Sequence, residues 1–283
     1  MSQVLNVYDH DRDSAGLTYV YPVISRRAGG VSVGINLNTN NACNWRCVYC
    51  QVPDLKRGSA PEVDLDKLAG ELRGFLRELL QGDFMLQRVP AEARRLNDIA
   101  LSGNGEPTSA KDFDQIVGLI GNIMAEFDLI GKIKLVLITN GSLIRRPKVK
   151  QGLRHMARLG GEVWFKLDSA TADGMRRING TRQTVQKMRE NLCTAAKLCP
   201  TWLQTCVFAL DGLPPADAEQ DAYLSFIGGV RAEDVPLRGV LLYGLARPSM
   251  QPEAARLSAL PREWMASFAA KIEARGLAVK LNC

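Results

Sequence analysis

The sequence predicts an α/β fold: a partial (β/α)6 TIM-like barrel of parallel strands with short N- and C-terminal extensions. Short apolar, β-branched segments alternate with longer segments of helical periodicity, and this alternation favours parallel strands joined by right-handed crossovers. Polar, glycine-rich segments follow the strands, at the edge where parallel α/β folds keep their sites. A chain of 283 residues often forms one such domain. We therefore expect a single domain over 1–283, with a lead-in at 1–30, a barrel core at 31–245 and an extension at 246–283.

The first half of the chain supplies the first expected strands and helices. Segment 31–37 alternates apolar and β-branched residues, which is typical of a strand. Segment 64–81 carries its leucines at helical spacing and begins with Asp64, a residue type that caps helices. Residues 82–96 are expected to form a polar connection between this helix and the next strand. The elements expected next are a strand at 98–101, a helix at 113–127, a strand at 133–138 and a helix at 147–159.

The second half continues the alternation of strands and helices. Its apolar spacing predicts strands at 162–167, 202–210, 237–243 and 277–281, and helices at 184–198, 216–228 and 261–275. The strand at 237–243 is the sixth of the barrel. The sheet is therefore expected to be parallel.

The composition favours a reducing compartment. The seven cysteines are an odd number without the spacing of a disulfide framework, which is typical of the cytosol. Segment 1–16 lacks the apolar region of a signal peptide, and no apolar run reaches the length of a membrane span. A net charge of +6 is compatible with phosphate-bearing partners. We therefore expect a cytoplasmic protein with no membrane association.

Three cysteines, Cys43, Cys47 and Cys50, lie close together in a polar segment. One interpretation is a helix face of small core residues, because positions i, i+4 and i+7 share a face. Their neighbours, such as Asn44 and Arg46, are polar, and the apolar stripe of a buried helix is missing. Thiolates gathered in a polar loop suit a soft metal instead.

Two kinds of metal site are open to these cysteines. A structural zinc site needs four ligands, and the two histidines, His10 and His155, are far away in the sequence. An iron–sulfur cubane normally takes four cysteines. With only three cysteine ligands, one iron stays open to an outside ligand. Such a cluster can take part in catalysis, whereas a cluster with four cysteine ligands only transfers electrons.

Four further polar segments follow predicted strands, namely SGNGEPT, TNGS, KLDSAT and YGLARPS. With the cysteine loop they should surround one opening, because the carboxyl ends of parallel strands meet at one edge. The alternative is that they are ordinary βα turns, which favour the same residue types. In SGNGEPT, Gly103 and Gly105 allow close approach of the backbone to a ligand, and Glu106 offers a carboxylate to an ammonium group.

The spacing C-x3-C-x-aromatic-C, with Tyr49 as the aromatic, resembles the signature of the radical S-adenosylmethionine (radical SAM) superfamily. The resemblance implies a [4Fe-4S] cluster on Cys43, Cys47 and Cys50, with S-adenosylmethionine (SAM) on the open iron. Reductive cleavage of SAM would release methionine and a 5′-deoxyadenosyl radical. That radical would take hydrogen from an unidentified substrate.

The resemblance also implies cofactor-binding residues around the cluster. The GxGEP-type motif meets the SAM amino group, which assigns Glu106 together with Asn104 and Gly105. The other cofactor-binding residues are then Tyr49 beside Cys50, Thr139 and Asn140 in TNG, and Tyr243 and Gly244 in the late-strand glycine motif near the adenine. Arg182 is assigned to the cofactor carboxylate, with an ordinary surface arginine as the alternative.

Lys166 and Asp168 are the candidate catalytic residues. They lie two apart at the end of a predicted strand, so both side chains face the barrel interior. The alternative is a pair that only compensates each other's charge, because buried charges need partners.

Across residues 20–245 the chain more closely resembles the wyosine-tRNA synthase-like iron–sulfur oxidoreductases. This resemblance rests on SRRAGGVSVGINL, CVYCQVP, SGNGEPTS, ITNGSL and KLDSA. It implies a reductant protein such as flavodoxin or ferredoxin, and a substrate that is tRNA or a small molecule. Wyosine synthases carry a second cluster on cysteines upstream of the first, whereas this chain has no cysteine before Cys43.

Three alternative functions stay open. One is an activating enzyme that places a glycyl radical on a partner, which suits the modest size. Another is tRNA modification, which the net positive charge of the chain favours. The third is a non-catalytic metal-binding module that uses the three cysteines as a zinc site.

We do not expect a second cluster on the remaining cysteines, which are Cys193, Cys199, Cys206 and Cys283. On one helix, Cys193 and Cys199 point about 120° apart. Cys206 falls in a strand at a position for a small core residue, and Cys283 is a terminal residue, a kind that is often loosely held. We therefore expect about four irons per chain.

Overall fold

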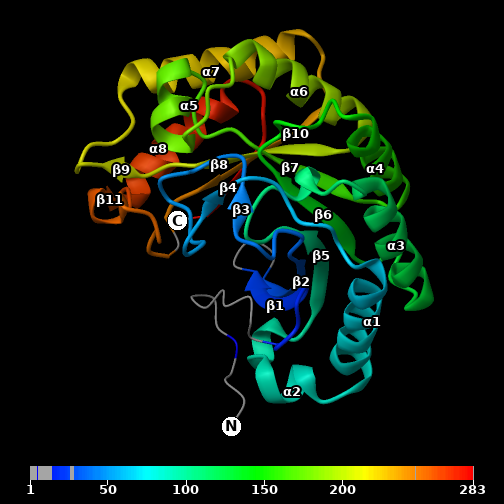
Figure 1. Ribbon diagram of the computed structural model, residues 1–283. Coiled ribbons are helices and arrows are strands. Elements are labelled where there is room, and N and C mark those ends of the chain that lie inside the picture. Colours follow the sequence, from blue (N-terminus) through cyan, green and yellow to red (C-terminus); the bar gives the residue numbers. More distant parts are fainter. Residues whose placement is uncertain (1–4, 6–14, 26–28, 246, 283) are drawn as a thin grey trace.

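The structure is a computed structural model that describes residues 5, 15–25, 29–245 and 247–282. Its centre is one curved sheet with the strand order β1-β2-β5-β6-β7-β8-β10-β12, curled into part of a barrel (Figure 1). Neighbouring strands from β2 onward are parallel. The strands are β1 (Val20–Ser25), β2 (Gly30–Ile35), β5 (Leu96–Leu101), β6 (Lys134–Thr139), β7 (Glu162–Lys166), β8 (Thr201–Cys206), β10 (Leu237–Tyr243) and β12 (Val279–Asn282). The predicted partial barrel is confirmed, and its six expected strands are β2, β5, β6, β7, β8 and β10.

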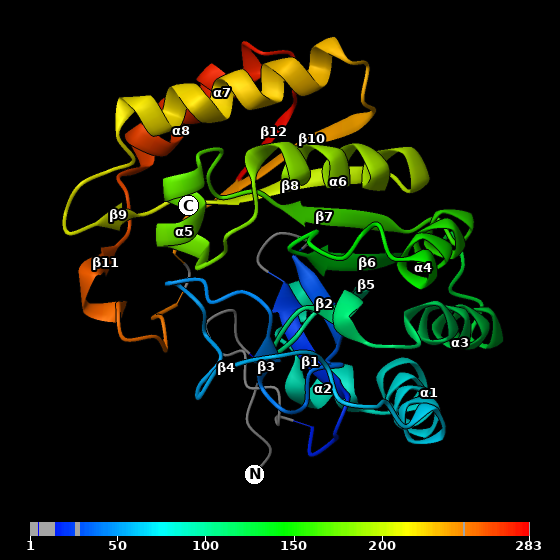
Figure 2. The same ribbon diagram turned by 45° about the horizontal axis from the view of Figure 1, so that its top comes forward.

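The long helices cover the outer face of the sheet (Figures 1 and 2). The helices are α1 (Leu65–Gln81), α2 (Phe84–Arg88), α3 (Phe113–Glu126), α4 (Pro147–Arg158), α5 (Ala172–Asn179), α6 (Val185–Leu198), α7 (Asp217–Ala232) and α8 (Arg262–Glu273). Asp64 caps α1 as predicted, because its carboxylate accepts a hydrogen bond from Lys67 N at 2.9 Å. Over the described part of the chain, none of the helices has the length and apolar character needed to span a membrane.

Strand β2 separates the core from the barrel interior. Val31, Val33 and Ile35 are completely buried and belong to the main hydrophobic core. The alternate residues face inward, as the two-residue period of a strand requires. Among them, Ser32 lines an interior cavity, and a Cβ on Gly34 would meet the Tyr21 ring at 2.2 Å. The inner face of β2 therefore contributes Ser32 to the cavity wall and packs the Tyr21 ring against Gly34.

The sequence predicts a parallel sheet, and this prediction is wrong at β1, a strand that lies within the lead-in expected at 1–30. Residues Val20–Ser25 form a strand that pairs antiparallel with β2. It contains Pro22, which is tolerated because β1 lies at the edge of the sheet. The predicted parallel order holds only from β2 onward.

Other segments also differ from the prediction. The strand expected at 202–210 ends at Cys206, and a separate strand β9 (Ala209–Leu210) pairs with β11 (Leu257–Ser258). The polar connection expected at 82–96 contains α2 and the short turn η1 (Ala91–Ala93). The segment after β7 contains α5, which is only eight residues long. Short helices carry too few periodic positions to be recognised from sequence.

Candidate active site

The polar segments that follow the strands meet at one cavity of about 300 Å³. It is lined by the cysteine loop, by residues 102–106 after β5, and by Thr139 and Asn140 at the end of β6. Lys166 of β7 and Tyr243 of β10 complete the wall. The cavity lies at the carboxyl ends of the parallel strands, as the sequence predicts.

The cysteine loop is fixed to other elements by the chain's own hydrogen bonds. Within the loop, β3 (Ala42–Cys43) pairs with β4 (Lys56–Arg57). Arg46 N donates to the Asn179 carbonyl at 3.0 Å, which ties the loop to the end of α5. Asn140 Nδ2 donates to Asn44 Oδ1 at 2.8 Å, which ties it to the end of β6. These contacts hold the three cysteines at the cavity.

Cys43, Cys47 and Cys50 all line the cavity and are free cysteines. Burial raises the pKa of Cys43 and Cys47 to about 12, so a metal must displace the protons when these thiols bind it. Two N–H groups already reach sulfur. Trp45 N donates to Cys43 Sγ at 3.4 Å, and Asn179 Nδ2 donates to Cys47 Sγ at 3.3 Å.

The three thiols are ligands of the kind that bind iron–sulfur clusters. Among the residues that the structure describes, no three Cys, His, Asp or Glu side chains converge closely enough to hold one metal ion. The cysteines of a cubane bind different iron atoms, so they line a cavity without meeting at one point. Thiolates are also the ligands that such clusters prefer.

The Glu106 carboxylate is buried and already bound by the protein. Its Oε1 accepts hydrogen bonds from Thr108 Oγ1 at 2.5 Å and Thr139 Oγ1 at 2.6 Å, and its Oε2 accepts one from Asn140 N at 2.7 Å. Burial raises the pKa of Glu106, although these hydrogen bonds oppose the shift. Glu106 therefore joins the end of β5 to the end of β6 in addition to lining the cavity.

The two glycines of SGNGEPT permit close backbone packing beside the cavity. A Cβ on Gly105 would meet Ala42 O at 2.1 Å, and Gly103 has a φ of +139°. Between them, Asn104 Nδ2 donates to Asn41 Oδ1 at 2.6 Å, while Asn104 Oδ1 is buried and has no hydrogen-bond partner among the described residues. Asn104 is also one of the residues that line the cavity.

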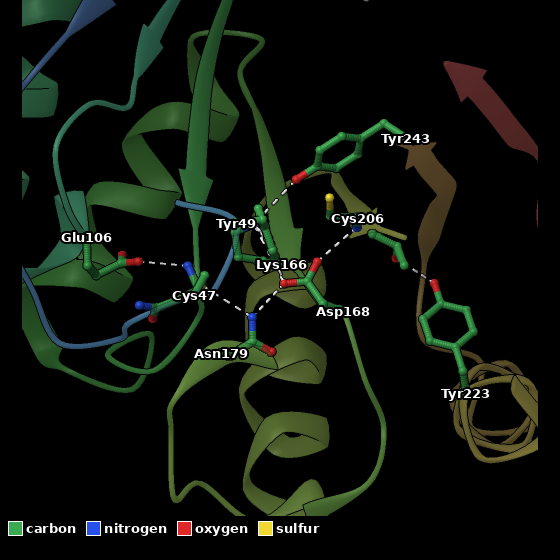
Figure 3. Close-up of polar contacts among 11 residues, drawn as sticks. Cys47, Tyr49, Glu106, Lys166, Asp168, Asn179, Cys206, Tyr223 and Tyr243 are labelled. Atoms are coloured by element: carbon green, nitrogen blue, oxygen red, sulfur yellow. Dashed lines mark hydrogen bonds and ion pairs between the residues drawn. The ribbon is translucent and has the colours of Figure 1, made fainter. Parts of the chain in front are cut away.

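Lys166, Asp168 and Tyr49 form one buried polar network (Figure 3). The Lys166 amine lies 3.7 Å from the Asp168 carboxylate and also donates to the hydroxyl groups of Tyr49 and Tyr243. The Tyr49 hydroxyl donates to Asp168 at 2.5 Å. Burial opposes the charge on Lys166, but Asp168 and Tyr243 outweigh it and hold the pKa of Lys166 well above its ordinary value. Lys166 thus places a compensated positive charge at the cavity wall.

Three predicted site residues do not line this cavity. Arg182 is exposed, so the structure gives it no contact with a ligand there. Gly244 donates its backbone N–H to Asn282 O at 3.1 Å. Asp168 lies behind the wall and holds Lys166 in place. The sequence analysis did not single out Arg247 as a site residue, although Arg247 belongs to the YGLARPS segment and lines the cavity.

The other cysteines lie in separate environments. Cys193 is partly exposed on α6, beside a surface groove. Cys199 is buried with its sulfur 3.5 Å from Gly161 O. Cys206 is buried in a small cluster with Val48 and Phe208. Cys283 lies outside the described residues.

Comparisons with curated proteins find distant relatives. A UPF0026 protein of Synechocystis sp. is 29% identical over 161 residues, which are 56% of this chain and 52% of that protein. A UPF0026 protein of Helicobacter pylori strain J99 is 24% identical over 196 residues, 68% of this chain and 56% of that protein. A GTPase Obg of Brachyspira hyodysenteriae is 25% identical over 223 residues, 76% of this chain but 29% of that protein. The chain spans about half the length of the two UPF0026 proteins and under a third of the GTPase.

Solved structures share the fold. A structure of TYW1 with a lysine-pyruvate adduct bound has a TM-score of 0.55 at 14% identity, over 89% of this chain and 74% of that one. A radical SAM methyltransferase from Sphaerobacter thermophilus has a TM-score of 0.60 at 13% identity, over 93% of this chain and 68% of that one. The family model of the Radical SAM superfamily matches residues 37–225, a segment that contains the three cysteines, Glu106 and Lys166. The chain therefore belongs to the radical SAM superfamily.

Proposed function

We propose that this chain is an enzyme that uses a [4Fe-4S] cluster and SAM to start radical chemistry on an unidentified substrate. The observation that carries the proposal is that three cysteines, the Glu106 loop and the Lys166 cation line one cavity of about 300 Å³. Cavities of ~300–1,000 Å³ hold cofactors and small molecules. Membership of the superfamily supports the same chemistry.

In this proposal Cys43, Cys47 and Cys50 hold the cluster and leave one iron open to SAM. When bound, the cluster and SAM supply the electron and the 5′-deoxyadenosyl radical that takes hydrogen from the substrate. Asn104 Oδ1 and the free acceptor capacity of Glu106 Oε2 suit the SAM ammonium group, because one is unpartnered and the other accepts a single hydrogen bond within the described chain.

The cations of the cavity wall suit an anionic group of the ligands. Lys166 and Arg247 line the wall, and Asp168 holds the Lys166 amine in position. Either cation can bind the SAM carboxylate or an anionic part of the substrate. Tyr49 lines the cavity beside Cys50 and packs against Phe208 with ring centroids 5.5 Å apart.

We further propose that a flavodoxin or ferredoxin supplies the electron and that the protein works in the cytoplasm. The described cysteines are all free, which fits a reducing compartment. The substrate is either a tRNA or a small molecule, and the experiment below distinguishes these two classes.

The test is anaerobic reconstitution with iron and sulfide, followed by SAM and dithionite, with 5′-deoxyadenosine measured by liquid chromatography. The proposal predicts equal amounts of 5′-deoxyadenosine and methionine. Bulk tRNA and a low-mass cell extract are added in separate samples, and the one that contains the substrate should increase the release. A cluster-loaded protein that releases no 5′-deoxyadenosine contradicts the proposal.

Glu106→Gln should retain the cluster but weaken SAM binding by ~1.5–3 kcal/mol, because a charged acceptor is lost. The change should also lower the free energy of unfolding. In the unaltered protein Asn140 N donates to Glu106 Oε2, and the amide of glutamine would place a second donor opposite this N–H. Calorimetric titration with SAM and denaturant unfolding separate these two effects. Glu126→Gln is the control, since Glu126 pairs with Arg73 on the surface; its SAM affinity should match the unaltered protein. Unchanged SAM affinity in Glu106→Gln would remove Glu106 from the ligand site.

A further inference from the structure

Asn179, the last residue of α5, contacts the site through its side-chain amide (Figure 3). Its Nδ2 donates to Cys47 Sγ at 3.3 Å and to Asp168 Oδ2 at 2.7 Å. An asparagine amide has two N–H donors, so these two contacts use both. Asn179 is 1% exposed, so water does not compete for them.

The surrounding chain fixes the direction of this amide. The Asn179 carbonyl accepts a hydrogen bond from Arg46 N at 3.0 Å, and Gly180 ends α5 in the left-handed conformation with a φ of 59°. A Cβ on Gly180 would meet Arg46 O at 2.9 Å, so glycine lets the helix end against the cysteine loop. On the other side, the Asp168 carboxylate is itself held by Tyr49. The N–H is thereby directed at the sulfur by contacts that do not involve a metal.

We propose that Asn179 is a positioning residue that raises the reduction potential of the cluster held by Cys47. The inference rests on the proposed function, because it requires that cluster. A hydrogen bond to a ligand sulfur stabilises negative charge, and reduction adds one electron to the cluster. The reduced state therefore gains more from the contact than the oxidised state, and hydrogen bonds to sulfur are among the factors that set cluster potentials.

The charges behind Asn179 preserve this effect. Asp168 alone would place a negative charge near the sulfur and oppose reduction. Its carboxylate lies 3.7 Å from the Lys166 amine, whose pKa is held well above its ordinary value. Because the pair is compensated, Asp168 orients the Asn179 amide without adding a net negative charge beside the cluster.

The experiment measures the midpoint potential of the cluster by redox titration with electron paramagnetic resonance (EPR) detection. Asn179→Leu keeps the branching and the number of side-chain heavy atoms and removes both donors, and Asn179→Ala removes them with a smaller side chain. In both, the equilibrium constant for reduction should fall about tenfold, a midpoint about 59 mV more negative for one electron. The matched control is Asn191→Leu. Asn191 is fully buried in α6, and its side-chain amide has no hydrogen-bond partner in the part of the chain that the structure describes. The midpoint of this variant should therefore match that of the unaltered protein.

Midpoints in Asn179→Leu and Asn179→Ala that equal that of the unaltered protein would overturn the inference. Loss of the cluster from both variants would overturn it as well, because Asn179 would then be needed for assembly rather than for potential. Failure of the proposed function is a different result. In that case the unaltered chain would hold no cluster, or would hold one and leave SAM uncleaved.

Discussion

Replacing Cys47 by alanine is expected to abolish binding of the iron–sulfur cluster while the fold survives. The cluster has three protein ligands in our account, and two thiolates cannot hold a cubane whose fourth iron is already open. Cys47 only packs against the margin of the main core, so the strands and helices do not depend on it. Iron and sulfide per chain after anaerobic reconstitution, with far-ultraviolet circular dichroism, measure both parts of the expectation.

The control for this change is Cys193→Ala. Cys193 is a partly exposed cysteine on α6, outside the cavity, so its replacement should leave iron binding unchanged. A Cys47→Ala protein that keeps the full cluster and still cleaves SAM would refute the assignment of the three cysteines.

Among the variants proposed here, Asp168→Asn is expected to destabilise the fold most. We expect a loss of about 3–5 kcal/mol in the free energy of unfolding. The Asp168 carboxylate accepts hydrogen bonds from Tyr49, from Asn179 and from Cys206 N at 2.9 Å, and its side chain is 0% exposed. An amide in its place turns a donor toward these groups and leaves the Lys166 cation uncompensated. Denaturant unfolding measures the loss.

Two further variants make this prediction specific. Asp211→Asn removes a carboxylate that pairs with Arg256 on the surface, so its loss should be much smaller. The double variant Asp168→Asn, Lys166→Met removes the uncompensated charge as well, so it should recover part of the stability. A stability of Asp168→Asn equal to that of Asp211→Asn would contradict the account of the buried network.

The part of the site that could be predicted from sequence depends on local motifs and on the parallel order of the strands. The cysteine spacing, the GNGEP segment and TNG each lie in one short stretch directly after a strand. Parallel strands bring their carboxyl ends to one edge, so the order of the motifs was sufficient to place them together. Lys166 and Tyr243 were found in the same way.

The parts that could not be predicted depend on contacts between distant segments. Asn179 reaches Cys47 across 132 positions of the chain, from a helix too short to show clear periodicity. Within INGTRQT nothing in the sequence separates the buried Asn179 from the exposed Arg182. The antiparallel pairing of β1 follows only once a strand is recognised before β2, because the four residues between Ser25 and Gly30 are too few for the crossover that parallel strands need.

The role of Glu106 shows a third limit of sequence reasoning. The motif points to a carboxylate for a ligand ammonium group, and Glu106 does line the cavity. Of the hydroxyl groups that bind the carboxylate, that of Thr108 lies two residues after Glu106, and that of Thr139 lies at the end of β6. Only the folded chain reveals that Glu106 also joins its own segment to the end of β6.

The central claim is that Cys43, Cys47 and Cys50 hold one cluster with an iron open to SAM. The most direct test is the EPR spectrum of the reduced, reconstituted protein with and without SAM, with iron counted in the same sample. We predict about four irons per chain and a spectrum that changes when SAM is added. About eight irons per chain, with the excess lost when Cys193, Cys199 and Cys206 are replaced together, or a spectrum that SAM leaves unchanged, would contradict the claim.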